Sequence, residues 1–268
     1  LRFLPDNTFE SCTSITDLVL PNTVTNIGSQ AFLSCANLAR LTIPASVIGI
    51  GLAFGNTYGL VQINVAADNP AFSGIDGVLF DKIQATLIQY PRAKAGSSYV
   101  IPDSVRHLAP HAFYGVPNLT RIYAGPSLAS IEGAAFESNP GLVGIYFRGD
   151  APTLTGSYVF YGDGNLTVYY LPGRAGWTST LQATPTAPWF LPYPVILSSD
   201  PGFGIHTNRF CFTISWATNA TVVVNASADL SKTNWEPVQT LPLVNGAARF
   251  ADAYWTNYPA RFYSVGAQ

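Results

Sequence analysis

The apolar residues of segment 31–44, AFLSCANLARLTIP, follow neither a helical face nor a plain alternating strand. They stand at Phe32, Leu38, Leu41 and Ile43, before a proline that ends the run. The same spacing recurs in five other segments, whose phenylalanines lie 22 to 24 residues apart except across one long gap. The six phenylalanines are Phe9, Phe32, Phe54, Phe113, Phe136 and Phe160. Such internal repetition is typical of stacked-repeat proteins.

A repeat of this length is too small to bury its own apolar edge, so the copies are expected to stack and cover one another. Apolar residues six, nine and eleven positions past each phenylalanine predict one short strand per coil. The last two of these positions point inward, and the residue between them faces solvent. Prolines such as Pro21 and Pro44 end the strand because they cannot donate to the next ladder bond. The pattern predicts a mainly β solenoid with coils of about 23 residues.

Two segments, IPASVIGIGLAFGNTYGL and IPDSVRHLAPHAFYGVPNL, resemble the BspA-like class of bacterial leucine-rich repeats. The resemblance covers about residues 1–190 and implies a leucine-rich-repeat solenoid. The long gap, residues 69–91, resembles the β-hairpin insert that this class carries, which we place at about residues 66–99. Taken alone, it predicts two strands, Val78–Phe80 and Thr86–Tyr90, around a polar turn.

The period disappears after the proline-rich segment 182–204, which is typical of a solenoid cap followed by a linker. We therefore predict a solenoid over 1–192, a linker over 193–204 and a small antiparallel β-sandwich over 205–268. The segments TNRFCFTIS, SADLSKTNWEPV and WTNYPARFYSV of the predicted sandwich resemble a C-terminal β module of secreted repeat proteins from Verrucomicrobia and related bacteria. Its predicted strands are Arg209–Trp216, Thr221–Ala226, Glu236–Leu241, Ala247–Phe250 and Arg261–Val265.

Composition narrows the classes of partner. Charged residues make up only 10% of the chain, and polarity comes instead from Ser, Thr, Asn and Gly, as suits a protein exposed outside a bacterial cell. The net charge of −2 without a basic cluster argues against nucleic acid. No apolar run approaches the roughly 20 residues of a membrane span. The chain starts at Leu1 and contains no methionine, so we expect a fragment or processed product that is secreted or held at the cell surface.

The cysteines are expected to be structural. Cys12 and Cys35 occupy the same position in adjacent coils, about 5 Å apart, which is within reach of a disulfide. Their side chains would point in parallel, which favours free thiols over a bond. Cys211 lies in an apolar strand and is expected in the core.

No motif carries a convincing catalytic, metal or cofactor site. His107 and His111 form H-x-x-x-H, but the pair lacks the carboxylate of a metalloprotease motif and aligns with predicted exposed turns. The GIGLAFG run at 49–55 resembles a phosphate loop, yet it coincides with the repeat turn and lacks the lysine. We therefore expect no enzyme activity, no cofactor and no metal.

One exposed position of the repeat is a candidate for ligand binding. Ten residues past the phenylalanine, three coils carry Tyr123, Tyr146 and Tyr170, and the adjoining exposed position carries Arg40 and Arg121. A row of aromatic faces with hydroxyl edges suits a sugar chain or an extended peptide. Alternatively, the row only stabilises the sheet, by about 0.2–1 kcal/mol per cross-strand pair.

The resemblance implies adhesion and surface interaction. We accordingly predict a non-enzymatic secreted or cell-surface protein that uses its exposed sheet to bind protein or glycan. Two alternatives stay open: an accessory carbohydrate-targeting part of a larger secreted enzyme, or a structural spacer. The sequence does not predict an oligomeric state.

Overall fold

The computed structural model describes residues 2–231 and 235–268, and its regular structure is almost entirely β. Within these residues the single helical element is a 3₁₀ turn, η1 (Trp255–Asn257). The chain forms two compact units. The first comprises residues up to 145, 152–167 and 182–184, and the second comprises 146–151, 168–181 and 185–268. The boundaries placed at 192 and 204 from the sequence stay predictions.

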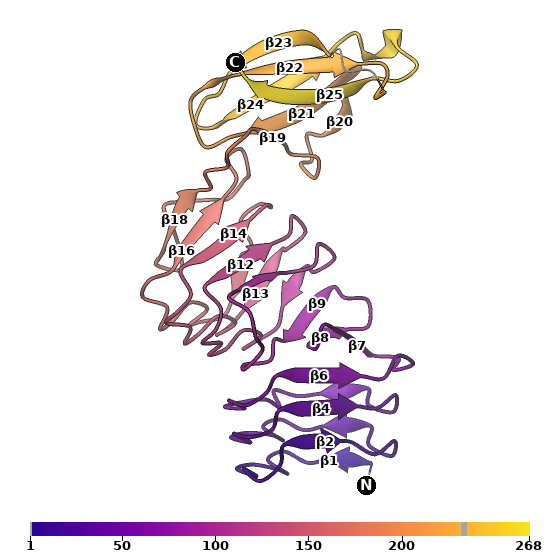
Figure 1. Ribbon diagram of the computed structural model, residues 1–268, viewed down its shortest axis with the longest axis vertical. Helices are drawn as coiled ribbons and strands as arrows, with labels where there is room; N and C mark the ends of the chain where they lie inside the picture. The colour runs from indigo at the N-terminus through magenta and orange to yellow at the C-terminus, as the bar shows by residue number, and fades with distance from the viewer. Residues whose placement is uncertain (1, 232–234) are drawn as a thin grey trace. The chain divides into compact units, whose positions relative to one another are not determined.

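The first unit opens with three coils, each contributing a strand to two small parallel sheets (Figure 1). In one sheet, Leu18, Leu41 and Ile63 stand side by side in register, one from each coil. This register confirms the repeat read from the sequence. That sheet contains β2 (Asp17–Val19), β4 (Arg40–Ile43) and β6 (Gln62–Val65), and the other contains β1 (Phe3–Leu4), β3 (Asn26–Ile27) and β5 (Gly49–Ile50).

The insert after β6 is a three-stranded antiparallel meander. Its strands are β7 (Phe72–Ile75), β8 (Val78–Asp81) and β9 (Thr86–Gln89). The two predicted strands are thus confirmed, and the structure adds β7 before them. Strand β9 has a second role, because it also pairs in parallel with β11 (His107–Leu108) of the next coil.

The residue that follows β9 begins a coil that the sequence reading missed. The Tyr90 N–H donates to the Ala112 carbonyl at 2.8 Å, and its ring stacks on Phe113 with centroids 5.2 Å apart. Tyr90 therefore takes the place of a phenylalanine. The repeat pattern does not predict this coil because tyrosine replaces phenylalanine and Gly96 stands at the expected leucine position. The long gap consequently holds an insert plus a seventh coil.

The solenoid continues through two further ladders. Strands β13 (Ser130–Glu132) and β15 (Thr153–Thr155) extend the ladder of β9 and β11, and β10 (Ser98–Val100) pairs in parallel with β12 (Arg121–Ala124). Strand β14 (Gly144–Phe147) falls across the division between the two units.

The phenylalanines line one wall of the first unit. Ring centroids lie 5.8 Å apart for Phe9–Phe32 and for Phe32–Phe54, and 5.2 Å and 5.7 Å apart for Phe113–Phe136 and Phe136–Phe160. Stacked rings of this kind combine a large buried apolar area with favourable ring geometry. The wall confirms the stacking of coils predicted from the repeat.

In the coils of Phe32 and Phe136, the side chain three residues past the phenylalanine ties the coil to the one before it. The Cys35 thiol donates to the Phe9 carbonyl at 2.9 Å, and the Asn139 amide donates to the Phe113 carbonyl at 2.9 Å. Cys12 and Cys35 are free thiols, as expected from the parallel direction of stacked side chains, and Cys211 is a free thiol buried in the sandwich, as expected.

The second unit combines the end of the solenoid with a sandwich. Its solenoid strands are β17 (Thr180–Leu181) and, apart from the first residue of each, the parallel strands β16 (Thr167–Tyr170) and β18 (Thr184–Pro188). Trp216 Nε1 donates to the Leu191 carbonyl at 2.8 Å, joining the sandwich to the segment after β18.

The sandwich consists of two antiparallel sheets, as predicted. Its buried core draws on both sheets and includes Phe212, Ile214, Val222, Val224 and Phe250. Residues 232–234 of the SADLSKTNWEPV segment lie outside the described part of the chain. One sheet contains β19 (Val195–Ile196), β20 (Gly204–His206), β21 (Arg209–Ser215) and β24 (Ala247–Asp252), and the other contains β22 (Thr221–Ser227), β23 (Glu236–Pro242) and β25 (Phe262–Ala267).

Candidate functional site

Three aromatic side chains gather on the second unit at the end of the solenoid. The rings of Tyr146 and Tyr169 stack with centroids 4.8 Å apart and planes within 9°. The Trp189 ring lies 5.2 Å from Tyr146 at a tilt of 55°. All three side chains are half-buried, so part of each ring reaches solvent. We call Tyr146, Tyr169 and Trp189 the aromatic row.

Tyr170 is not part of this row, which corrects the sequence prediction. Its ring stacks on Trp177 at 5.0 Å, and Trp177 in turn contacts the fully buried ring of Phe147 at 5.1 Å. Tyr170 therefore packs with inward-facing residues, and Tyr169 takes the outward place beside Tyr146.

A one-residue shift in the last coil explains the exchange. The Gly144 N–H, eight residues past Phe136, donates to the Thr120 carbonyl at 3.2 Å. In the next coil the equivalent bond, from Thr167 to the Val143 carbonyl at 3.2 Å, starts only seven residues past Phe160. Because side chains alternate along a strand, a slip of one residue exchanges the inward and outward sets.

Two other candidates lie on β12 in the first unit. Tyr123 stands between the buried Ile122 and Ala124 and is half-buried, so it faces outward as predicted. Arg121 begins the strand, is exposed, and stands opposite Ser98 of β10.

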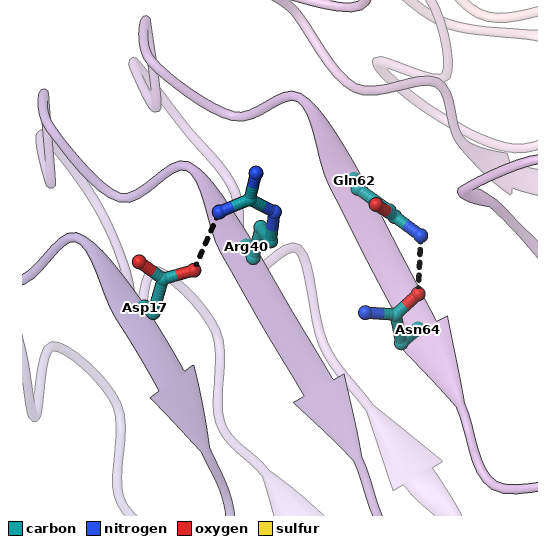
Figure 2. A network of polar contacts seen from close by, with 4 residues as sticks. All are labelled: Asp17, Arg40, Gln62 and Asn64. Carbon is teal, nitrogen blue, oxygen red and sulfur yellow. Dashed lines mark hydrogen bonds and ion pairs between the residues drawn. The ribbon is translucent and has the colours of Figure 1, made fainter.

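Arg40 is engaged in an ion pair, which limits it as a ligand contact. Figure 2 shows its guanidinium group turned toward Asp17, with 3.1 Å between nitrogen and oxygen and more than half of each side chain exposed. On the neighbouring strand the Gln62 amide donates to Asn64 at 2.6 Å. Exposed pairs contribute about 0–1 kcal/mol each. These four side chains on the first coils are thus polar and paired with one another, unlike the aromatic row.

The histidine pair is divided between two structural roles. His107 lies at the start of β11, rather than in a turn, and its Nδ1 is 2.7 Å from Ser130 Oγ. The ring of His111 meets the edge of Tyr114 at 5.5 Å. Across residues 2–231 and 235–268, no group of three or more His, Cys, Asp or Glu side chains is arranged to hold a metal ion.

The first unit also contains a cavity of about 680 Å³ that the sequence reading did not identify. It lies between the turn around Phe54 and the segment after β9, and its wall includes Ile88, Ala109 and Glu137. The Arg92 guanidinium lies 4.1 Å from the Tyr58 ring centroid and 5.3 Å from that of Tyr114. One of its terminal nitrogens is buried and has no hydrogen-bond partner in the described structure. The interrupted period between Phe54 and Phe113 is the signal that marks this place.

A family model for the BspA-type leucine-rich repeat region matches six copies over residues 2–87 and 92–178. The chain belongs to the BspA-type leucine-rich repeat family. BspA-type proteins are typically bacterial surface or secreted proteins, and their repeats are generally non-enzymatic binding modules. Among the described residues, no helix is long and apolar enough to cross a membrane.

Solved structures of other leucine-rich repeat proteins resemble this BspA-type chain. The pneumococcal vaccine antigen PcpA matches with a TM-score of 0.51 and 24% identity, over 63% of this chain and 54% of that one. A leucine rich cell surface protein from Faecalibacterium prausnitzii matches with a TM-score of 0.48 and 24% identity, over 62% and 56%. The chain thus spans about half the length of these structures. A search of curated proteins found no match.

Proposed function

We propose that this BspA-type chain is a non-enzymatic binding or adhesion protein, secreted or held at a bacterial cell surface. The observation that carries the proposal is the aromatic row, three half-buried side chains in which the Tyr146 ring contacts those of Tyr169 and Trp189. Their apolar faces and polar edges suit the faces of sugar rings or the side chains of an extended peptide. The typical surface or secreted location of BspA-type proteins supports the proposed location.

The rings are well prepared for binding because the sheet already orders them. Tyr169 pairs with Ala187 across β16 and β18, and the Trp189 N–H donates to the Tyr170 carbonyl at 2.7 Å. Side chains that are fixed before binding lose less conformational entropy when a ligand arrives. The row is therefore proposed as the main contact, with Tyr123 and Arg121 as further candidates on the first unit.

Substitution of the row tests the proposal. We expect Tyr146→Ala combined with Tyr169→Ala to lower affinity for a glycan or protein ligand, found on an array with the full chain, by about tenfold or more. Tyr161→Ala, which removes a 64% exposed ring elsewhere, is the matched control and is expected to retain binding. Thermal unfolding of each variant separates loss of binding from loss of fold. Equal binding by all variants would exclude the row as the contact surface, and an array that shows no binding to the full chain would favour a spacer role.

A second candidate is an accessory carbohydrate-targeting part of a larger secreted enzyme, favoured by the suitability of the row for sugars. The gene sequence upstream of Leu1 tests it, since a hydrolase domain there would favour this reading. In either case we propose that the sandwich, predicted at 205–268 and resembling modules of Verrucomicrobia repeat proteins, acts as a spacer or anchor.

A further inference from the structure

Four coils of the first unit donate the same three main-chain hydrogen bonds to the coil that follows. In each, the N–H groups of the phenylalanine and of the residues two before and two after it donate to the next turn. For the coil of Phe32, the Gln30, Phe32 and Ser34 N–H groups donate to the carbonyls of Leu52, Ala53 and Gly55 at 2.8, 3.0 and 2.8 Å. The coils of Phe9, Phe113 and Phe136 repeat the pattern.

The coil of Phe54 breaks this rule. In the described structure no main-chain acceptor is found for the equivalent N–H groups of Leu52, Phe54 and Asn56. These three residues line the cavity of about 680 Å³, at the place where the next turn would otherwise stand. The insert therefore leaves three donors in register with nothing of the main chain to receive them.

The aromatic wall is interrupted at the same place. Ring contacts join Phe9, Phe32 and Phe54, and a separate series begins at Tyr90, with no ring contact between Phe54 and Tyr90 in the described residues. Phe54 is 8% exposed, whereas Phe32 is fully buried. An apolar position in the wall thus stands open between two coils.

We propose that this cavity binds an extended peptide that takes the place of the missing turn. Its carbonyl groups accept from the N–H groups of Leu52, Phe54 and Asn56, and an aromatic side chain enters the wall beside Phe54. The unpartnered nitrogen of Arg92 supplies a further donor for a peptide carbonyl. Main-chain bonds of this kind provide affinity, and the pocket for one side chain provides specificity.

The polar side chains around the cavity are compatible with this ligand. Besides Arg92, the wall carries Gln30, Gln89, His111 and Glu137. Glu137 places a negative charge in the wall, which disfavours a strongly anionic small molecule and favours a neutral peptide segment. The inference uses a surface on the first unit, so it is independent of the aromatic row.

A peptide copied from the chain's own turn provides the test. The probe is a synthetic peptide of residues 133–139 with blocked ends and Glu137→Gln, which makes it uncharged, and the control peptide also carries Phe136→Ser. Titration into the full ¹⁵N-labelled chain is expected to shift the amide signals of Leu52, Phe54 and Asn56 most. The control peptide is expected to bind about tenfold more weakly or worse, which corresponds to a loss of about 1.4 kcal/mol. Shifts elsewhere, equal binding of both peptides, or no shift would overturn the proposal.

Two further measurements keep the test independent of folding. In the free chain, the three amides are expected to exchange with deuterium faster than those of Gln30, Phe32 and Ser34, and the peptide is expected to slow them. Ala109→Trp, which fills the cavity, is expected to abolish binding, whereas Ala129→Trp on the exposed surface is expected to leave it unchanged. Binding that survives Ala109→Trp in a folded variant would contradict the assigned site.

Discussion

Asp163 is a buried carboxyl group in the position that Cys35 and Asn139 occupy in other coils. One of its oxygens accepts from the Asn139 N–H at 2.6 Å, and the other has no hydrogen-bond partner in the described structure. Burial raises the pKa of Asp163 from 3.8 to about 7, opposed in part by the Asn139 N–H. Asp163 thus links its coil to the preceding one, and its burial disfavours the charged form of its carboxyl group.

This carboxyl group predicts a pH dependence of stability. The pKa of Asp163 in the folded chain lies above its unfolded value of 3.8. Between pH 3.8 and about 7, the folded chain therefore binds more protons at Asp163 than the unfolded chain does. The contribution of Asp163 is therefore fully present below about pH 4 and is lost as the pH rises through 7. Asp163→Asn keeps the acceptor and is expected to stabilise the chain by about 1–2 kcal/mol at pH 8, with little effect at pH 4. Urea unfolding at both pH values checks this, with the exposed Asp68→Asn as control. An equal effect at both pH values would contradict the assignment.

At the scale of elements, the coil behaves as one unit because its phenylalanine packs between two neighbours. Phe136 is fully buried and stacks on Phe113 and Phe160, whereas Phe9 is only partly buried at the start of the wall. The energetic importance of a phenylalanine should therefore depend on its place along the wall.

Alanine substitution tests that dependence. Phe136→Ala is expected to lower the free energy of unfolding by about 3–5 kcal/mol, as for large core truncations. Phe9→Ala is expected to cost clearly less, because it has one ring neighbour and partial exposure. Denaturant unfolding of the two variants measures the difference, and equal costs would argue against a stack with nearest-neighbour coupling.

The elements also show how far the sequence could lead. The six phenylalanines, the insert strands and the sandwich strands were predictable, because apolar spacing reflects burial directly. The coil of Tyr90 was missed because two of its key positions depart from the pattern. Tyr146 was placed correctly on the outward face, but Tyr169 and Tyr170 were exchanged, since the sequence alone does not fix the register of a shortened coil. The cavity depends on how the insert separates two turns, which spacing cannot reveal.

At the scale of the whole molecule, the end of the solenoid and the sandwich share one compact unit. Gly246, with φ of +77°, lies so close to Pro172 that a Cβ atom there would be 2.8 Å from the proline Cβ. Arg174 also donates to Ser199 Oγ at 2.8 Å. The sandwich therefore covers groups that the last coils would otherwise expose.

Truncation tests this shared stability. A chain ending at residue 192 loses the contact of Gly246 with Pro172 and the bond from Trp216 to Leu191. Its last coils are therefore expected to unfold at a lower temperature than in the full chain. Fluorescence of Trp177 and Trp189, which both remain, reports on this region. An unchanged thermal midpoint would show that the last coils are stable without the sandwich.

Strand β9 pairs both with β8 of the insert and with β11 of the next coil, which has a consequence for engineering this molecule. Strand β9 aligns the later coils through its pairing with β11. Their alignment therefore does not depend on the length of the insert that separates β9 from the coil of Phe54. The turn between β8 and β9, where Ile83 is 78% exposed, is therefore a natural grafting point at which foreign epitopes of different lengths can be displayed.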